Sequence, residues 1–379
     1  MTATSAALKR TPLHALHLER GARMVAFAGY EMPVQYSLGI LKEHLQVRAA
    51  AGLFDVSHMG QFAVRPVKGA LDVAARALET LLPVELVGLG EGRQRYGLLT
   101  NDQGGIRDDL MIANMGDCFL IIANAACKDA DEAHLRQALA GRCEVERLDR
   151  ALLALQGPAA EALLAQMAPD VAAMRFMDVR RVALLGGGCV IARAGYTGED
   201  GFEISVPAPM ADALARKLLA DSRVTMVGLG ARDSLRLEAG LCLYGSDLDP
   251  STTPVEGALE WSIQSARRNG GSRAGGFPGA AVILGQLESG APRRRVGLQP
   301  EGRAPIRYGT PLFSDTRSDA PIGTVTSGGF GPSVGAPVAM GYVAAPVAAA
   351  AAPIYAELRG ERVPIRIAKL PFVTPTYKR

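Results

Sequence analysis

The segment from residue 264 to residue 280 constrains the fold of this chain most, because it is rich in Gly, Ser, Arg and Pro and carries no apolar periodicity. Such a segment supports neither a helix nor a strand and is typical of a linker. The chain of 379 residues is also two to three times as long as a usual domain. The sequence therefore predicts one region at 11–263, a Gly-rich linker at 264–280 and a second domain at 281–379.

Short β-rich runs separated by Gly and Pro follow this linker. They lie at 295–298, 322–326, 338–343, 354–358 and 363–367. Runs of this length and spacing are typical of a small barrel or sandwich. The Ala/Pro stretch at 344–353 is short, and we interpret it as a loop.

Helices and strands are interspersed before the linker. Ile40, Leu41, Leu45 and Ala49 recur at helical spacing, and Gly52 follows where a left-handed helix cap would lie, so we expect an amphipathic helix at 40–51. Further helices are expected at 130–140, after Pro158 and at 208–219. Strands are expected at 118–123, 153–155, 189–193 and 202–206.

Charge and hydropathy exclude some classes of protein. The net charge is only +3, with Lys and Arg scattered along the chain, which argues against a nucleic-acid binder. The one tight basic run, Arg293 to Arg295, is typical of a solvated strand end, although a docking site for an acidic partner stays open. The sequence contains no run of about 18 uncharged apolar residues, so it predicts no membrane-spanning helix. We interpret the chain as cytoplasmic.

Metal and covalent catalysis have no visible candidates. The five cysteines include no C-x-x-C pair, which argues against a disulfide framework or a zinc knuckle. The five histidines lack metal-ligand spacing, and no Ser or Cys lies in a nucleophile elbow. Gly228-x-Gly230 lacks the third glycine of a nucleotide loop and is interpreted as a turn.

Two adjacent carboxylates, Asp108 and Asp109, end a turn that begins at Asn101 and is flanked by apolar residues. Successive residues of a strand face opposite sides, so the two acids should have different environments and different ionisation behaviour. The residues alone favour a solvated hairpin turn over a functional pair.

Two further segments combine charge with apolar surroundings. Glu203 lies in an alternating strand, with Phe202 and Ile204 on the other face. Arg232 and Arg236 are one helical turn apart and share a side. A structural ion pair is the favoured interpretation of any such pair alone, but together these groups could hold a polar heterocycle with an acidic tail.

Many ordered blocks, from about Thr11 to Tyr377, resemble the aminomethyltransferases of the glycine cleavage system. They are Arg10–Leu13, Met24–Gly29, Leu53–Met59, Asn101–Leu110, Ala154–Pro158, Gly195–Gly201, Ala231–Gly240, Thr253–Glu256, Arg293–Gly297, Ile322–Gly328 and Pro371–Val373. The resemblance implies a three-lobed, cloverleaf-like α+β protein with a small C-terminal β-barrel, which holds tetrahydrofolate in a central channel. It also implies transfer of a methylene group from the aminomethylated lipoyl arm of the H-protein to tetrahydrofolate, with release of ammonia.

The resemblance assigns roles to individual residues. Asp109 matches the essential carboxylate near the folate nitrogens that receive the carbon, and Asp108 is expected only to support the turn. Glu203 matches the carboxylate that grips the pterin edge, where an ionised acid can accept two parallel N–H bonds. Five further residues match or plausibly line the ligand site: Met59, Asn124, Tyr196, Arg232 and Tyr377. Tetrahydrofolate is implied as the acceptor substrate, without a metal.

Two alternatives stay open. One is a relative that takes one-carbon units from another donor, as in the folate domains of sarcosine and dimethylglycine dehydrogenases. The other is a non-catalytic folate-binding protein of the iron–sulfur assembly type. That group carries K-G-C-Y-x-G-Q-E, where this chain has Gly195-Tyr-Thr-Gly-Glu-Asp-Gly201.

Overall fold

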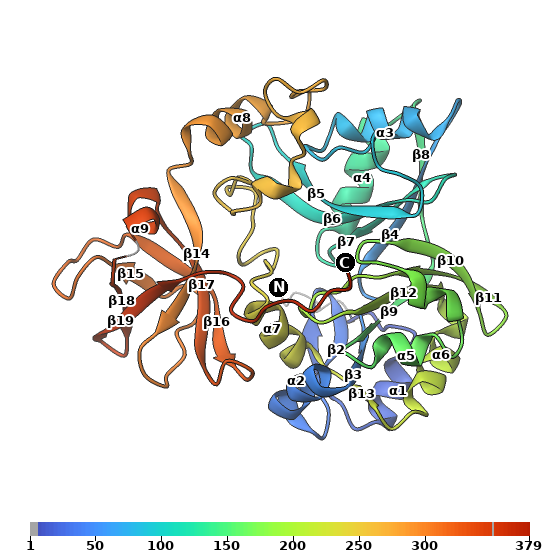
Figure 1. The fold of residues 1–379 in the computed structure, drawn as a ribbon, viewed down its shortest axis with the longest axis horizontal. Coiled ribbons are helices and arrows are strands. Elements are labelled where there is room, and N and C mark those ends of the chain that lie inside the picture. Colours follow the sequence, from blue (N-terminus) through green and yellow to red (C-terminus); the bar gives the residue numbers. More distant parts are fainter. Residues whose placement is uncertain (1–6, 351) are drawn as a thin grey trace, which may run out of the picture. The chain divides into compact units, whose positions relative to one another are not determined.

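The computed structural model describes residues 7–350 and 352–379 (Figure 1). These residues form two compact units. Unit 1 comprises the described part of Met1–Gln61 together with Leu148–Asp233 and Thr376–Arg379. Unit 2 comprises Phe62–Arg147 and Ser234–Pro375. Both units are assembled from segments that are distant in sequence, and the predicted boundaries at 264–280 stay a prediction.

Unit 1 is built on a six-stranded sheet with the order β10-β11-β12-β9-β3-β13. The strands are β10 (Val179–Leu184), β11 (Gly187–Ala192), β12 (Gly201–Pro207), β9 (Arg150–Gln156), β3 (Ala51–Asp55) and β13 (Val224–Met226). β12 pairs antiparallel with β11 and with β9, so it is an interior strand of the sheet. A separate hairpin is formed by β1 (Arg23–Phe27) and β2 (Tyr30–Gln35).

One face of this sheet carries the core of unit 1. Phe202 and Ile204 of β12 are fully buried, whereas Glu203 between them is partly exposed, as the alternating pattern predicts. Leu163 and Leu214 join the same core from two helices, and each such buried side chain contributes about 1.5–3 kcal/mol. The helices of the unit are α1 (His14–Glu19), α2 (Gly39–Ala49), α5 (Ala160–Leu164), α6 (Ala211–Leu219) and the first part of α7 (Leu229–Glu238).

The helix expected at 40–51 is present as α2, but its buried face is not the predicted one. Leu41 and Leu45 are exposed, while Glu43 is fully buried. The Glu43 carboxylate accepts hydrogen bonds from the backbone N–H groups of Tyr36 (2.6 Å) and Gly228 (2.9 Å), which offset its loss of water. The predicted cap is also wrong, because Gly52 lies in β3 rather than at the end of the helix.

Unit 2 contains a five-stranded sheet with the order β5-β6-β7-β4-β8. The strands are β5 (Arg93–Thr100), β6 (Ile106–Asn114), β7 (Phe119–Ala123), β4 (Gly60–Pro66, whose first two residues are grouped with unit 1) and β8 (Cys143–Arg147). Besides the second part of α7, the α-helices of unit 2 that precede the C-terminal strands are α3 (Leu71–Glu79), α4 (Lys128–Ala138) and α8 (Ala280–Ser289). Apolar residues of this sheet and of α3 and α4 form a second core.

The segment 264–280 is held against the rest of unit 2 by ion pairs. Arg273 reaches Glu79 (2.9 Å) and Glu85 (2.9 Å), and the buried Arg267 lies 3.4 Å from Glu79. Glu79 also accepts hydrogen bonds from the backbone N–H groups of residues 86 and 87. The segment lacks apolar periodicity, and ion pairs attach it to the rest of unit 2.

The β-rich runs after the linker form a closed barrel with the order β14-β17-β16-β15-β18-β19. Its strands are β14 (Arg293–Pro300), β15 (Pro311–Phe313), β16 (Gly323–Gly331), β17 (Ala336–Ala344), β18 (Ile354–Leu358) and β19 (Glu361–Ala368). The prediction of a mixed helix and strand region followed by a small C-terminal barrel is confirmed. The loop expected at 344–353 is wrong, because α9 (Ala345–Ala350) occupies most of it.

The basic run at the start of β14 is used inside unit 2. Arg293 pairs with Glu256 (3.1 Å) and Arg294 with Glu260 (2.8 Å). Arg295 is buried and donates to the backbone carbonyls of residues 257 and 240. The run is therefore more than a solvated strand end.

None of the helices in the described part of the chain is both long and apolar enough to cross a membrane.

Candidate active site

A tight turn positions Asp109 on the hairpin of β5 and β6 in unit 2. Asn101 opens the turn, and its side-chain oxygen accepts hydrogen bonds from the N–H groups of Gln103 (3.0 Å) and Gly105 (2.9 Å). A Cβ on Gly105 would lie 1.8 Å from a backbone oxygen, so only glycine fits. Asp109 then stands opposite Leu98 within β6 and is partly exposed.

Two neutral donors hold the Asp109 carboxylate. The Tyr96 hydroxyl donates to Oδ2 (3.0 Å), and Asn124 Nδ2 donates to Oδ1 (2.7 Å). Asn124 directly follows β7, the strand beside β6. Each oxygen of the Asp109 carboxylate therefore accepts one of these two hydrogen bonds.

Asp108 faces a different environment, as the strand pattern predicts, but its expected role in the turn is wrong. Its side chain is fully buried and accepts hydrogen bonds from Asn124, through the backbone N–H (3.0 Å) and Nδ2 (2.8 Å). Asn124 Nδ2 thus bridges Asp108 and Asp109. Asp108 acts on the site by orienting the amide that holds Asp109.

A third buried acid, Asp131 in the first turn of α4, shares a hydrogen bond with Asp108. Burial is the main cause that raises the pKa of all three acids, and the negative charge of Asp108 adds to the effect on its two neighbours. The pKa of Asp109 reaches about 7 and that of Asp131 about 9. Near neutral pH the cluster of Asp108, Asp109 and Asp131 therefore retains protons. Asp109 is then close to half protonated.

Two aromatic residues near Asp109 were not predicted from the sequence. Trp261 is 60% exposed and stacks on Tyr96, with ring centroids 5.3 Å apart and planes 25° from parallel. The position of Tyr96 has a signal in the sequence. Leu98 is the cross-strand partner of Asp109, and Tyr96, two residues before Leu98, lies on the same face of the hairpin. Trp261 has no local signal, since it lies 165 residues away in the short 3-10 helix η3 (Glu260–Ser262).

In unit 1, Glu203 and Arg232 form a second charged group. Among the residues that the structure describes, none donates a hydrogen bond to the Glu203 carboxylate, and burial raises its pKa while the charge of Arg232 lowers it. The Arg232 guanidinium lies over the ring of Tyr196, 4.6 Å from its centroid. The structure thus brings together three predicted site residues, Tyr196, Glu203 and Arg232. The Glu203 carboxylate accepts no hydrogen bond from the described residues.

Close backbone packing fixes the start of the helix that carries Arg232. A Cβ on Gly228 would lie 2.5 Å from the backbone of Val34, and one on Gly230 would lie 2.5 Å from the Ile40 side chain. The two glycines therefore let α7 approach β2 and α2. Their role is packing, which agrees with the rejection of a nucleotide loop.

The other two predicted residues of unit 1 lie in irregular segments. Tyr377 stacks on Phe176, with centroids 4.1 Å apart and planes 6° from parallel. Met59 lies just before β4 and is partly exposed.

Comparisons with known proteins identify the family. The model of the GCVT N-terminal domain matches residues 13–267, and that of the glycine cleavage T-protein C-terminal barrel domain matches residues 293–374. The chain belongs to the aminomethyltransferases of the glycine cleavage system. It is 46% identical to the aminomethyltransferase T crystal structure from Bartonella henselae, with a TM-score of 0.91, over 98% of this chain and 100% of that one.

Curated relatives agree along nearly the whole chain. The mitochondrial aminomethyltransferase of Dictyostelium discoideum is 42% identical and that of Homo sapiens 43%, each over 98% of this chain and over 94% and 91% of their own lengths. Both names specify mitochondria, and the cytoplasmic location of this chain stays a prediction. The activity and the family expected from the sequence are confirmed.

The candidate residues of this aminomethyltransferase share one property. Each is partly exposed, as a side chain that meets a ligand must be, whereas Asp108 is fully buried. The residues are Met59, Asp109, Asn124, Tyr196, Glu203, Arg232 and Tyr377. Within 7–350 and 352–379, no group of three or more His, Cys, Asp or Glu could hold a metal ion.

Proposed function

We propose that this aminomethyltransferase takes the methylene of the aminomethylated lipoyl arm of the H-protein and transfers it to tetrahydrofolate, with release of ammonia. Family membership supports this proposal, because the family uses tetrahydrofolate. In the reaction, the carbon loses its bonds to nitrogen and sulfur and gains bonds to two folate nitrogens. The protons of these folate nitrogens leave with ammonia and with the dihydrolipoyl sulfur.

Glu203 carries the folate-binding part of the proposal. Its carboxylate is partly exposed and accepts no hydrogen bond from the described residues, yet Arg232 favours its ionised form. An ionised carboxylate with both oxygens open can accept two parallel N–H bonds from a 2-amino-4-oxo ring. Arg232, Tyr196, Tyr377, Asn124 and Met59 contribute to the binding of the substrates.

Asp109 carries the chemical part. Loss of ammonia leaves an electron-poor carbon, which a nearby carboxylate stabilises. With a pKa of about 7, the same group can accept a folate proton and release it again near neutral pH. Tyr96 and Asn124 hold the carboxylate through one donor on each oxygen.

The test is the formation of 5,10-methylenetetrahydrofolate and ammonia from purified aminomethylated H-protein. Parallel reactions supply sarcosine or dimethylglycine as the one-carbon donor. We expect product only with the H-protein. Product from the amines alone would replace the proposed donor and would favour the alternative class of one-carbon transferases.

A further inference from the structure

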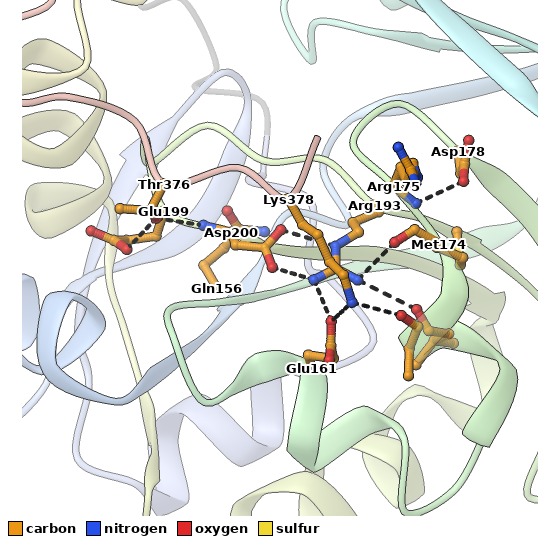
Figure 2. Close-up of polar contacts among 12 residues, drawn as sticks. Gln156, Glu161, Met174, Arg175, Asp178, Arg193, Glu199, Asp200, Thr376 and Lys378 are labelled. Carbon is orange, nitrogen blue, oxygen red and sulfur yellow. Dashed lines mark hydrogen bonds and ion pairs between the residues drawn. The ribbon is translucent and has the colours of Figure 1, made fainter.

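The last four residues of the sequence, Thr376–Arg379, belong to unit 1 and dock on its loop between β11 and β12 (Figure 2). The Thr376 N–H donates to the carbonyl of Gly198 (2.9 Å), and its hydroxyl donates to Glu199 Oε2 (2.7 Å). The same hydroxyl accepts a hydrogen bond from the Asp200 N–H (3.2 Å). Thr376 is therefore anchored through its backbone and its side chain.

Lys378 forms a second anchor, on the other side of Tyr377. Its Nζ donates to Glu161 Oε2 (2.7 Å) and to the carbonyl of Ala172 (2.7 Å). The Lys378 carbonyl accepts a hydrogen bond from the Phe176 N–H (2.7 Å). The ion pair alone is exposed to solvent and would contribute little, but the backbone bonds place it in a fixed geometry.

A buried guanidinium connects the two anchors, as Figure 2 shows. Arg193 is 1% exposed and donates to Glu161 (2.6 Å), which also binds Lys378. Arg193 Nε donates to Asp200 (3.0 Å), whose N–H binds Thr376. Polar contacts thus connect five residues into one network, which we call the circuit, on both sides of Tyr377. They are Glu161, Arg193, Asp200, Thr376 and Lys378.

Tyr377 itself is held between the anchors. Phe176 stacks on one face of its ring, and the backbone on either side is fixed by the bonds of Thr376 and Lys378. Without these bonds, the segment would have to be ordered when a ligand binds, at a cost in backbone entropy. The bonds of Thr376 and Lys378 order the segment before a ligand binds, so binding does not carry that entropy cost.

We propose that residues 376–379 act as a latch that presets the orientation of Tyr377, so Thr376 and Lys378 are positioning residues for folate binding. The inference rests on the proposed role of Tyr377 at the ligand site. It assigns a function to a circuit of residues that lies beside the ligand-contacting groups.

The test measures the Kd of 5-methyltetrahydrofolate, an unreactive folate, for Thr376→Val, Lys378→Met and Tyr377→Ala. We expect the two latch variants to bind about 3- to 10-fold more weakly, the ratio for one or two lost hydrogen bonds, with kcat at saturating folate unchanged. Lys378→Arg and Thr376→Ser keep the bonds and should restore affinity. Lys369→Met, at an exposed lysine outside the latch, is the matched control.

Hydrogen exchange at the Thr376 and Phe176 amides gives a readout that does not depend on folate. Both amides should exchange faster in Lys378→Met and Thr376→Val than in the wild type. Normal affinity in the latch variants, with weakened binding in Tyr377→Ala, would overturn the latch and leave the ligand role of Tyr377 intact. Normal affinity in Tyr377→Ala would instead remove Tyr377 from the proposed function, and the latch with it.

Discussion

Asp109 in unit 2 and Glu203 in unit 1 are carboxylates of the same kind in opposite electrostatic settings. Both lie inside strands, both are partly exposed, and burial is the main cause that raises the pKa of each. The neighbouring charge then differs in sign. Asp108 raises the pKa of Asp109 further, whereas Arg232 lowers that of Glu203.

This difference shows how one functional group, the carboxylate, can serve two tasks. An acid beside another acid is held near its midpoint at neutral pH, where it can exchange a proton. A neighbouring cation instead favours the ionised form of an acid and offsets part of the effect of burial, and the ionised form accepts hydrogen bonds. The comparison therefore supports the proposed roles of Asp109 in proton transfer and of Glu203 in ligand recognition.

The largest expected effect is on the rate of Asp109→Asn. Asparagine keeps the shape of the side chain but can neither take up a proton nor carry a charge, so kcat should fall at least about 100-fold, the lower range for a lost general acid–base. The Kd of 5-methyltetrahydrofolate should stay near that of the wild type. Asp102→Asn, in the exposed turn of the same hairpin, is the control. Near-normal turnover would exclude Asp109 from the mechanism.

The same variant tests the pKa of Asp109 through stability. The folded-state pKa is raised from 3.8 to about 7, so the protonated form favours folding at pH below 3.8 and this contribution is lost as the pH rises to about 7. At pH 8 the wild type carries the cost of a charged carboxylate that is partly removed from water and lies beside Asp108, so Asp109→Asn should melt at a higher temperature. At pH 3.5 the two melting temperatures should converge. A destabilised variant at pH 8 would contradict the raised pKa.

The second effect is on affinity alone. Glu203→Ala should weaken the binding of 5-methyltetrahydrofolate by about 1.5–3 kcal/mol, the range for hydrogen bonds to a charged group. Glu203→Gln keeps the shape and one acceptor oxygen, so its Kd should lie between those of the wild type and the alanine variant. Titration calorimetry measures all three. Equal dissociation constants for the wild type and both variants would show that Glu203 has a structural role and does not bind the ligand. The contrast with Asp109 would then be wrong.

Local patterns in the sequence predict much of the site scaffold. The alternation of Phe202, Glu203 and Ile204 places the carboxylate on the partly exposed face of β12, and the turn after Asn101 predicts the hairpin that carries Asp109. Both depend on neighbours within a few residues. The role of each carboxylate, by contrast, came from the resemblance to a family.

Features that depend on distant partners could not be predicted. Glu43 is buried because it binds a backbone N–H 185 residues away, and this reverses the face of α2 that packs inward. Asp108 contacts Asn124 and Asp131 only after β7 and α4 fold back on β6. Lys378 meets Glu161 across 217 residues. Each pair joins polar groups whose periodicity gives no signal.

The smallest effect concerns Tyr96, whose hydroxyl donates to Asp109 and thereby lowers its pKa. Tyr96→Phe should raise that pKa further, so the rising limb of the kcat profile should move to higher pH. Since one unit of pKa changes the ionised fraction up to 10-fold, we expect roughly a 3- to 10-fold loss of rate near pH 7 and little loss well above the midpoint. Tyr308→Phe, at an exposed tyrosine, is the control. A uniform loss at every pH would mean that Tyr96 acts through packing against Trp261, and that Asn124 alone positions the Asp109 carboxylate.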